Sequence, residues 1–181
     1  MEIIDTSIPD VKLLKPNVFR DERGYFFESF RQDVLENAGI NIHFVQDNQS
    51  MSQKATLRGL HYQIPPFAQD KLVRVTQGAV IDVAVDIRPS SPTYGKHVMQ
   101  ELSAENGLQM LVPKGFAHGF LVLEDYTVFQ YKCSNYYQKE FEKGLQWNDV
   151  DLGINWPINN PILSEKDKHQ TAFRDLDKDF G

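Results

Sequence analysis

Two basic residues occupy strand positions at which core residues are expected, within residues 56–77, TLRGLHYQIPPFAQDKLVRVTQ. Alternation along a strand places His61 on the face of Leu57, and it places Lys71 on the face of Val73 in the next strand. If both side chains point into one barrel, an imidazole that can accept a proton lies near an ammonium that can stabilise negative charge. Each residue alone also fits a simpler role: His61 could be a hydrogen-bonded core histidine, and Lys71 could be a solvated residue at a strand end.

The orientation of Arg58 depends on its neighbour Gly59. Strict alternation puts Arg58 on the face opposite to His61, whereas a bulge at Gly59 would re-aim the strand and could bring the two side chains together. Both arrangements remain open. Another strand has one wholly polar face, which could contact solvent or line a ligand cavity. This polar face consists of Gln46, Asn48 and Ser50.

His118 follows a proline and glycine turn in VPKGFAHGF, which is similar to the second metal motif of cupin barrels. The first such motif normally supplies an H-x-H pair and an acid, but the sequence here has His61-Tyr62-Gln63. Zinc and iron sites generally need three or more ligands from His, Cys or carboxylates. We therefore expect a barrel without a metal, with a metal-dependent cupin as an alternative.

Two further residues could take part in chemistry, although the pattern alone does not single them out. Tyr131 shares the face of Phe129 and Cys133, and a strand tyrosine is most often a core aromatic. Asp167 lies in the charged segment LSEKDKH, which by composition is a solvated surface loop.

Period-two patterning dominates the middle of the chain and predicts antiparallel β structure. The clearest strand covers residues 80–88, where Ile81, Val83 and Val85 predict one buried face. Residues 32–38 predict a short helix ended by Gly39, and the charged C-terminal tail could form another. Further strands are expected at residues 25–30, 96–102, 107–112, 118–123 and 127–133, divided by turn sequences. The fold prediction is a mainly β sandwich or barrel forming a single domain over residues 1–181.

Composition excludes several classes of function. The 19 Lys and Arg against 25 Asp and Glu give a net charge of −6, so no general basic field favours nucleic acid. The single cysteine, Cys133, cannot form an internal disulfide, and the acidic start MEIIDTSIPD lacks the features of a signal peptide. The longest apolar stretches are too short to cross a membrane. We expect a cytoplasmic protein with no nucleic-acid or membrane partner.

The ordered set of motifs resembles the dTDP-4-dehydrorhamnose 3,5-epimerase family, cofactor-independent cupin enzymes of rhamnose biosynthesis. The resemblance covers most of the chain, and the order of the motifs makes it specific. It implies a cupin-like double-stranded β-helix, or jelly-roll barrel, with a few short helices. The matching segments are DERGYFFESF (21–30), QDNQS (46–50), LRGLHYQ (57–63), QDKLVRVTQG (69–78), PKGFAHGF (113–120), YKCSNYY (131–137) and LSEKDK (163–168).

The resemblance implies a base, an orienting acid, a cation and a proton donor, which match His61, Asp167, Lys71 and Tyr131 respectively. Hydrogens beside a ketone are weakly acidic because their loss gives an enolate, and these residue types suit its formation and reprotonation. The implied reaction inverts C3 and C5 of a dTDP-4-keto-6-deoxy sugar without metal or redox cofactor. Related enzymes invert one centre or move the ketone, and a non-catalytic sugar-nucleotide barrel is a further alternative.

Substrate-binding positions and a dimer are also implied by the resemblance. Members of the family are dimers in which the strand near Phe26 to Phe30 reaches the neighbouring subunit, so Arg23 and Glu28 could serve the partner's site. Gln138 stands where family members often have proline, which bears only on the local path to Glu142. The implied binding residues are Arg23, Glu28, Gln46, Asn48, Arg58, His118, Glu142 and Lys166.

Overall fold

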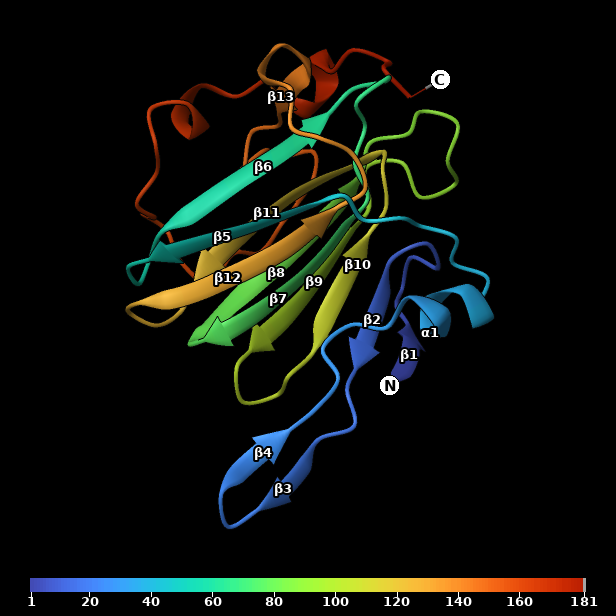
Figure 1. Ribbon diagram of the computed structural model, residues 1–181. Helices are drawn as coiled ribbons and strands as arrows, with labels where there is room; N and C mark the ends of the chain where they lie inside the picture. Colours follow the sequence, from blue (N-terminus) through green and yellow to red (C-terminus); the bar gives the residue numbers. More distant parts are fainter. Residues whose placement is uncertain (181) are drawn as a thin grey trace.

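The computed structural model describes residues 1–180 and consists mainly of two antiparallel sheets that face each other (Figure 1). The six-stranded sheet has the order β1 (Glu2–Asp5), β2 (Lys12–Lys15), β10 (Gln109–Val112), β7 (Lys71–Gln77), β12 (Thr127–Cys133) and β5 (Gln46–Ser52). The five-stranded sheet has the order β13 (Glu142–Gly144), β6 (Leu57–Gln63), β11 (Phe116–Val122), β8 (Ala79–Asp86) and β9 (His97–Ser103). This arrangement confirms the prediction of a mainly β, cupin-like fold.

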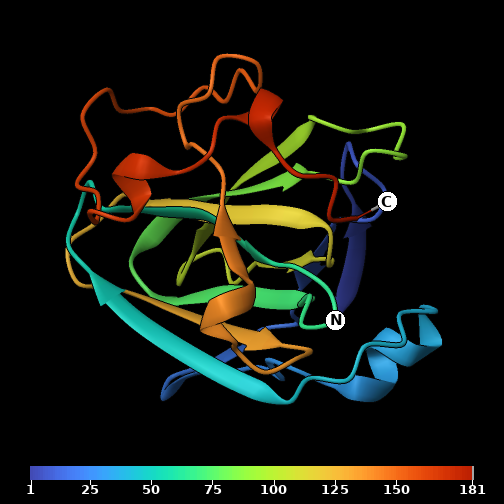
Figure 2. The same ribbon diagram turned by 90° about the horizontal axis from the view of Figure 1, so that it is seen from above.

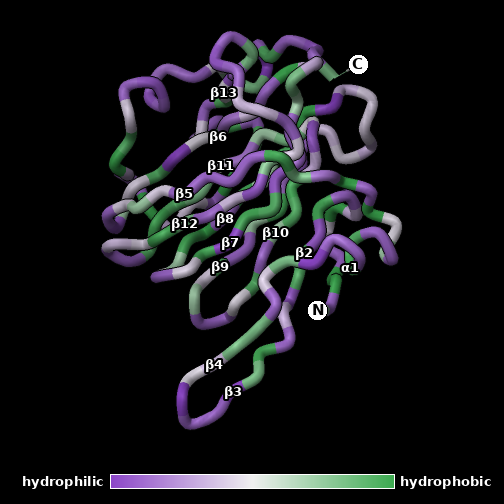
Figure 3. Tube along the Cα trace, viewed as in Figure 1, coloured by the Kyte–Doolittle hydropathy of each residue, from purple (hydrophilic) through white to green (hydrophobic). Residues whose placement is uncertain are grey.

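The barrel interior is closed by apolar side chains from both sheets. Val73 and Phe129 from the six-stranded sheet pack in one buried cluster with Val80 and Phe120 from the five-stranded sheet. Hydrophobic and hydrophilic residues alternate along the central strands (Figure 3), as expected where each strand sends every second side chain inward. This cluster fills one part of the barrel and leaves space for polar side chains elsewhere.

Strand β8 differs from the prediction of one buried face, because both of its faces are covered. Val83 and Val85 pack outward under the C-terminal tail, and Val80 and Ala84 pack inward. The tail, red in Figure 2, lies against the outer side of this sheet and supplies Trp156 to the outward cluster. The sequence could not show that a distant segment covers the second face.

A hairpin projects from the barrel before the helix. It is formed by β3 (Phe19–Asp21) and β4 (Gly24–Phe26), so the strand predicted over residues 25–30 ends earlier than expected. The hairpin extends away from both sheets in Figure 1. The predicted helix is present as α1 (Gln32–Asn37), and it buries Leu35 against the outer face of the six-stranded sheet.

The C-terminal tail contains short 3₁₀ turns and no longer helix within the described residues, in contrast to the helix considered from its charge. These turns are η2 (Asp167–His169) and η3 (Phe173–Asp175), and η1 (Lys139–Phe141) precedes β13. Backbone hydrogen bonds from Leu57 N–H to Ile162 O (3.0 Å) and from Ile162 N–H to Ala55 O (2.8 Å) attach the tail to the start of β6. Within residues 1–180, no helix has the length and apolar character needed to span a membrane.

Candidate active site

Two adjoining cavities open between the sheets, and they share the side chains of His61, Lys71 and Tyr131. Their volumes are about 480 and 400 Å³. The larger is also lined by Ser50, Arg58, His118, Phe129, Ser164 and Asp167, and the smaller by Gln46, Asn48, Gln63, Gln69, Tyr137 and Glu142. Residues from distant parts of the chain therefore meet in one polar space inside the barrel.

His61 forms a hydrogen-bonded pair with Asp167, which the tail brings to the mouth of the barrel on η2. The His61 Nε2 to Asp167 Oδ1 distance is 2.5 Å, and Asp167 Oδ2 accepts from Ser164 Oγ at 2.8 Å. Burial would raise the pKa of Asp167, but its hydrogen bonds, led by the one with His61, outweigh burial and lower it. An ionised carboxylate at Nε2 holds the proton there, which leaves Nδ1 as the nitrogen that can accept a proton.

Lys71 and Tyr131 lie on the inner faces of neighbouring strands. Tyr131 is opposite Val73, and Cys133 is opposite Lys71, in the antiparallel register of β12 with β7. Burial lowers the pKa of Lys71 and raises the pKa of Tyr131. Within residues 1–180, Lys71 has no ion-pair partner, so its charge is available to a ligand in the cavity.

A bulge in β6 decides the orientation of Arg58. His118 on β11 is opposite His61, but Phe120, two residues later, is opposite Arg58, so β6 contains one extra residue. Gly59 sits at this irregularity with φ +122°, and a Cβ there would lie 2.6 Å from Gly119 Cα. The bulge brings Arg58 and His61 to one cavity, which resolves the two arrangements left open by the sequence.

The polar face of β5 lines the cavities, which resolves the second open alternative. Gln46 and Asn48 border the smaller cavity, and Ser50 borders the larger one. At the rim, Glu142 Oε2 accepts from Tyr137 Oη at 2.8 Å and forms an ion pair with Lys166 at 2.5 Å. Six of the predicted binding residues are thus brought to this region: Gln46, Asn48, Arg58, His118 and Glu142 line the cavities, and Lys166 is paired with Glu142.

Arg23 and Glu28 are not brought to these cavities. Arg23 lies on the projecting hairpin and pairs with Asp21 at 2.5 Å, and Glu28 lies 3.5 Å from Arg31. Nothing within the described chain places either side chain beside His61. Both residues belong to the segment that leaves the barrel.

His118 is part of a second histidine and carboxylate pair that the sequence interpretation missed. Its Nε2 lies 2.9 and 3.0 Å from the two carboxylate oxygens of Asp82 on β8. The alternation over residues 80–88 predicts that Asp82 faces solvent, whereas it lies on the inward face of β8 with Val80 and Ala84. Tyr137 and Ser164 were also missed, and they had no distinguishing pattern.

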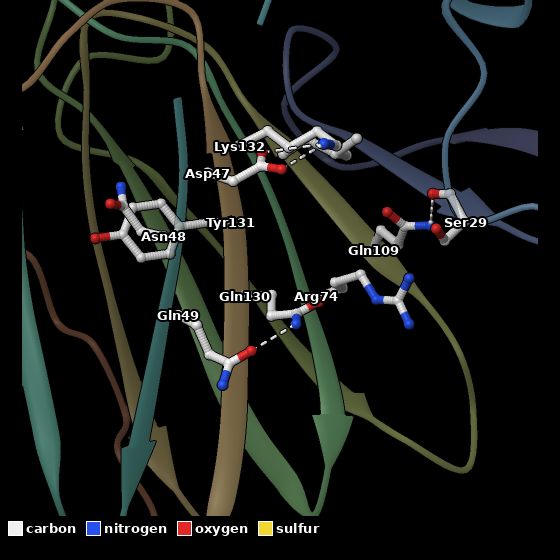
Figure 4. Close-up of a pocket in the computed structure, with 10 residues that line it drawn as sticks. Ser29, Asp47, Asn48, Gln49, Arg74, Gln109, Gln130, Tyr131 and Lys132 are labelled. Carbon is white, nitrogen blue, oxygen red and sulfur yellow. Dashed lines mark hydrogen bonds and ion pairs between the residues drawn. The ribbon is translucent and has the colours of Figure 1, made fainter. Parts of the chain in front are cut away.

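A further pocket of about 350 Å³ lies on the outer face of the six-stranded sheet (Figure 4). Most of its polar side chains have partners: Lys132 pairs with Asp47 at 3.0 Å, Gln130 donates to Gln49 at 2.7 Å, and Gln109 donates to the backbone carbonyl of Ser29 at 2.7 Å. Arg74, which also lines this pocket, has its guanidinium carbon 5.3 Å from the centroid of the Phe27 ring. Tyr131 and Asn48 point to the opposite side of their strands in Figure 4. The outer pocket is therefore distinct from the barrel interior.

Comparison with known proteins gives a consistent result. Residues 5–175 match the family model described as dTDP-4-dehydrorhamnose 3,5-epimerase. The chain belongs to this family. It is 56% identical over 178 residues to the dTDP-4-dehydrorhamnose 3,5-epimerase of Shigella flexneri, with 98% of each chain covered. These relatives are epimerases, a class of isomerase.

Solved structures of relatives share the fold. The dTDP-6-deoxy-D-glucose-3,5-epimerase of Legionella pneumophila, in complex with dTDP-4-keto-L-rhamnose, matches with a TM-score of 0.93 and 48% identity, covering 97% of this chain and 94% of that chain. A 3'-monoepimerase from Streptomyces bikiniensis, in complex with dTDP-quinovose, matches with a TM-score of 0.89 and 32% identity, covering 94% of this chain and 87% of that chain. The fold is thus shared by epimerases that act at one centre and at two.

Proposed function

We propose that this chain epimerises dTDP-4-dehydro-6-deoxy-D-glucose at C3 and C5 to give dTDP-4-dehydro-L-rhamnose, without metal or redox cofactor. The observation that carries this proposal is the His61–Asp167 pair, 2.5 Å apart, in a cavity that also holds Lys71 and Tyr131. Relatives that act on this class of sugar nucleotide match nearly the whole chain. We also infer that residues 1–181 form a single cytoplasmic domain.

His61 is the base in this proposal. Removal of hydrogen from C3 or C5 gives an enolate whose charge rests on the C4 oxygen, so a base and a cation are needed together. Nδ1 of His61 takes the proton, and Asp167 stabilises the imidazolium that forms because its carboxylate accepts from Nε2. Asp167 is itself held by Ser164, which keeps the imidazole in one orientation.

Lys71 and Tyr131 complete the reaction in their proposed roles. The Lys71 ammonium stabilises the enolate oxygen, and it acts strongly because burial removes competing water. The Tyr131 phenol returns a proton to the opposite face of the ring, and burial raises its pKa, which keeps the donor protonated at rest. Proton removal on one face and delivery on the other inverts the carbon.

The remaining polar residues suit the nucleotide part of the substrate. Arg58 donates to Ser52 Oγ at 3.0 Å, and its guanidinium can still present other N–H groups to a diphosphate. We assign substrate binding to the residues that line or border the cavities. They are Gln46, Asn48, Arg58, His118, Glu142 and Lys166.

Incubation with the 4-keto sugar nucleotide in deuterated water, followed by NMR, tests the reaction. We expect deuterium at both C3 and C5 with the unaltered protein, and near-complete loss of exchange with His61→Ala. Tyr131→Phe should chiefly impair delivery of the second stereocentre. Tyr126→Phe is a matched control, because Tyr126 is exposed on the turn before β12.

Each other outcome supports a different function. Label at one carbon indicates a single-centre epimerase, as in the relative from Streptomyces bikiniensis. Binding of dTDP without any exchange indicates a non-catalytic barrel. Stoichiometric metal in the purified protein, with activity lost to a chelator, indicates a metal-dependent cupin.

We also propose a homodimer in which the hairpin reaches the site of the partner. Three large side chains of the hairpin, Phe19, Tyr25 and Phe26, are 60% or more exposed, which is unusual for a clustered apolar surface on a monomer. Arg23 lies in the hairpin turn and Glu28 in the segment just after β4, and both are away from the cavities of their own chain. In a dimer they would serve the neighbouring subunit's site.

Mixing two inactive variants tests this exchange. In a mixed dimer of His61→Ala and Arg23→Ala, one site has an intact His61 and receives an intact Arg23 from the other subunit. We expect activity to return on mixing. Each mixed dimer should reach at most about half the activity of an unaltered dimer, because its other site lacks both groups. Failure to recover activity, with mixed dimers shown by native mass spectrometry, would contradict the exchange.

A further inference from the structure

The His118–Asp82 pair resembles the His61–Asp167 pair but is built differently. His118 and His61 are directly opposite each other in the register of β11 with β6, and both line the larger cavity. The carboxylate that pairs with His61 arrives on the tail, whereas Asp82 lies on β8, the strand next to β11 in the same sheet. Two histidines therefore meet one cavity, each with Nε2 engaged by an acid.

Asp82 occupies a position that is costly for a carboxylate. Its exposure is 0%, and it lies on the inward face of β8 between Val80 and Ala84, both in the apolar core. Within residues 1–180, the only side-chain hydrogen bonds of Asp82 are those with His118. A buried carboxylate with one partner contributes little stability compared with a packed apolar residue. Its presence therefore points to a role in holding His118.

We propose that Asp82 is a positioning residue that keeps the proton of His118 on Nε2, so that Nδ1 is presented to the cavity as an acceptor for a hydroxyl group of the substrate sugar. This inference rests on the proposed function. A neutral imidazole that donates from one nitrogen accepts at the other. An acceptor suits a sugar hydroxyl and not the ketone oxygen, which has the Lys71 ammonium as its partner.

The surroundings of His118 restrict it to this positioning role. Its ring is 7% exposed and lies 6.2 Å, centroid to centroid, from the ring of Phe129, nearly parallel to it at 26°. His61 is more open, with a side chain 27% exposed. A ring fixed between strands suits recognition of one hydroxyl, whereas the base needs room to reach the hydrogens of two carbons.

NMR of protein labelled with ¹⁵N in histidine tests the tautomer without relying on turnover. We expect the proton of His118 on Nε2 at neutral pH, and a change at Nδ1 when dTDP-glucose, which carries hydroxyls and no ketone, is added. The amide of Asp82→Asn can donate to Nε2, which favours the proton on Nδ1 and turns the acceptor into a donor. This variant should raise KM about 10-fold to 100-fold, with a smaller change in kcat.

Asp149→Asn is the matched control. Asp149 is also a buried acid, but it accepts from the backbone N–H groups of Asp151 and Phe173 outside the cavities, so its loss should lower stability and leave the His118 tautomer and KM unchanged. The inference is overturned if unaltered protein carries the proton on Nδ1, or if folded Asp82→Asn keeps its KM. If that variant does not fold, the spectrum of the unaltered protein still decides. A protein with the expected tautomer but no turnover would reject the proposed function instead.

Discussion

The two faces of strand β12 both carry polar side chains, but they satisfy them differently. On the outer face, Lys132 binds Asp47 and Gln130 binds Gln49. On the inner face, Tyr131 forms no side-chain hydrogen bond with residues 1–180, and neither does Lys71 on the adjoining strand. Polar content alone therefore does not mark a site. A concave surface with unpaired, desolvated polar groups does mark a site. Each such group carries an uncompensated desolvation penalty, which a hydrogen bond or ion pair with a ligand offsets.

The largest effect expected on the inner face follows loss of His61, the proposed base. His61→Ala should lower kcat/KM for the 4-keto sugar nucleotide by about 100-fold to 10,000-fold, as is typical of a lost general base. His43→Ala is the control, since His43 is exposed and outside both cavities. The measurement is steady-state kinetics with unfolding curves for both variants. A loss below about 10-fold with the fold intact would contradict the assignment of His61.

Replacement of Lys71 should have the next largest effect and should also change the pH profile. Lys71→Met removes the cation and should lower kcat by about 100-fold to 1,000-fold. Burial lowers the pKa of Lys71 from its ordinary value of 10.5, so activity should fall with rising pH before 10.5, as the ammonium loses its proton. The guanidinium of Lys71→Arg stays charged, so any remaining activity should persist to higher pH.

Ionisation of Tyr131 is the other possible cause of a fall in activity at high pH. Burial raises the pKa of Tyr131 and lowers the pKa of Lys71, so the two ionisations are displaced in opposite directions along the pH scale. If the pH at which activity falls changes in Tyr131→Phe and stays the same in Lys71→Arg, then the fall is due to Tyr131 and not to Lys71.

Gly59→Ala should have a smaller effect on catalysis, because it acts through the backbone. A Cβ at Gly59 would lie 2.6 Å from Gly119 Cα and 2.8 Å from His118 O, so β6 and β11 would have to separate. We expect destabilisation of about 1–3 kcal/mol, measured by chemical unfolding, and a raised KM because Arg58 loses its orientation. Gly39→Ala is the control: it also has positive φ, +77°, but nothing lies within 4 Å of the added Cβ. Equal losses in both variants would show that φ alone matters.

The sequence predicts the local parts of this structure better than the distant contacts. Strand β12 is found at residues 127–133, as its period-two pattern predicts. The inward orientation of Lys71 also follows from alternation. The position of Arg58 could not be decided, because the bulge at Gly59 depends on how closely two backbones approach.

Asp167 shows the limit of sequence patterns most clearly. It is separated from His61 by 106 residues, and it lies in a segment whose composition is that of a solvated loop. The pair forms only because backbone hydrogen bonds of Ile162 attach the tail to β6. Asp82 does not stand out either, because the pattern assigns the face of Val80 and Ala84 to solvent, where an acid is expected, and only the structure shows that this face points inward. The family resemblance pairs Asp167 with His61, and the structure places the two side chains together, whereas the contact between Asp82 and His118 is visible only in the structure.

The smallest effect is expected on the outer face, from Lys132→Met. The Lys132–Asp47 pair has side chains that are 30% and 72% exposed, and ion pairs of this kind contribute about 0–1 kcal/mol. The variant should change kcat/KM less than about 2-fold, because Lys132 points away from the cavities and its loss leaves an exposed carboxylate that water can solvate. Steady-state kinetics and native mass spectrometry together distinguish the two outcomes that would contradict this prediction. A 10-fold loss with the oligomeric state unchanged would place the outer pocket in the catalytic unit, whereas a loss that follows dissociation would mean that this face stabilises the proposed dimer.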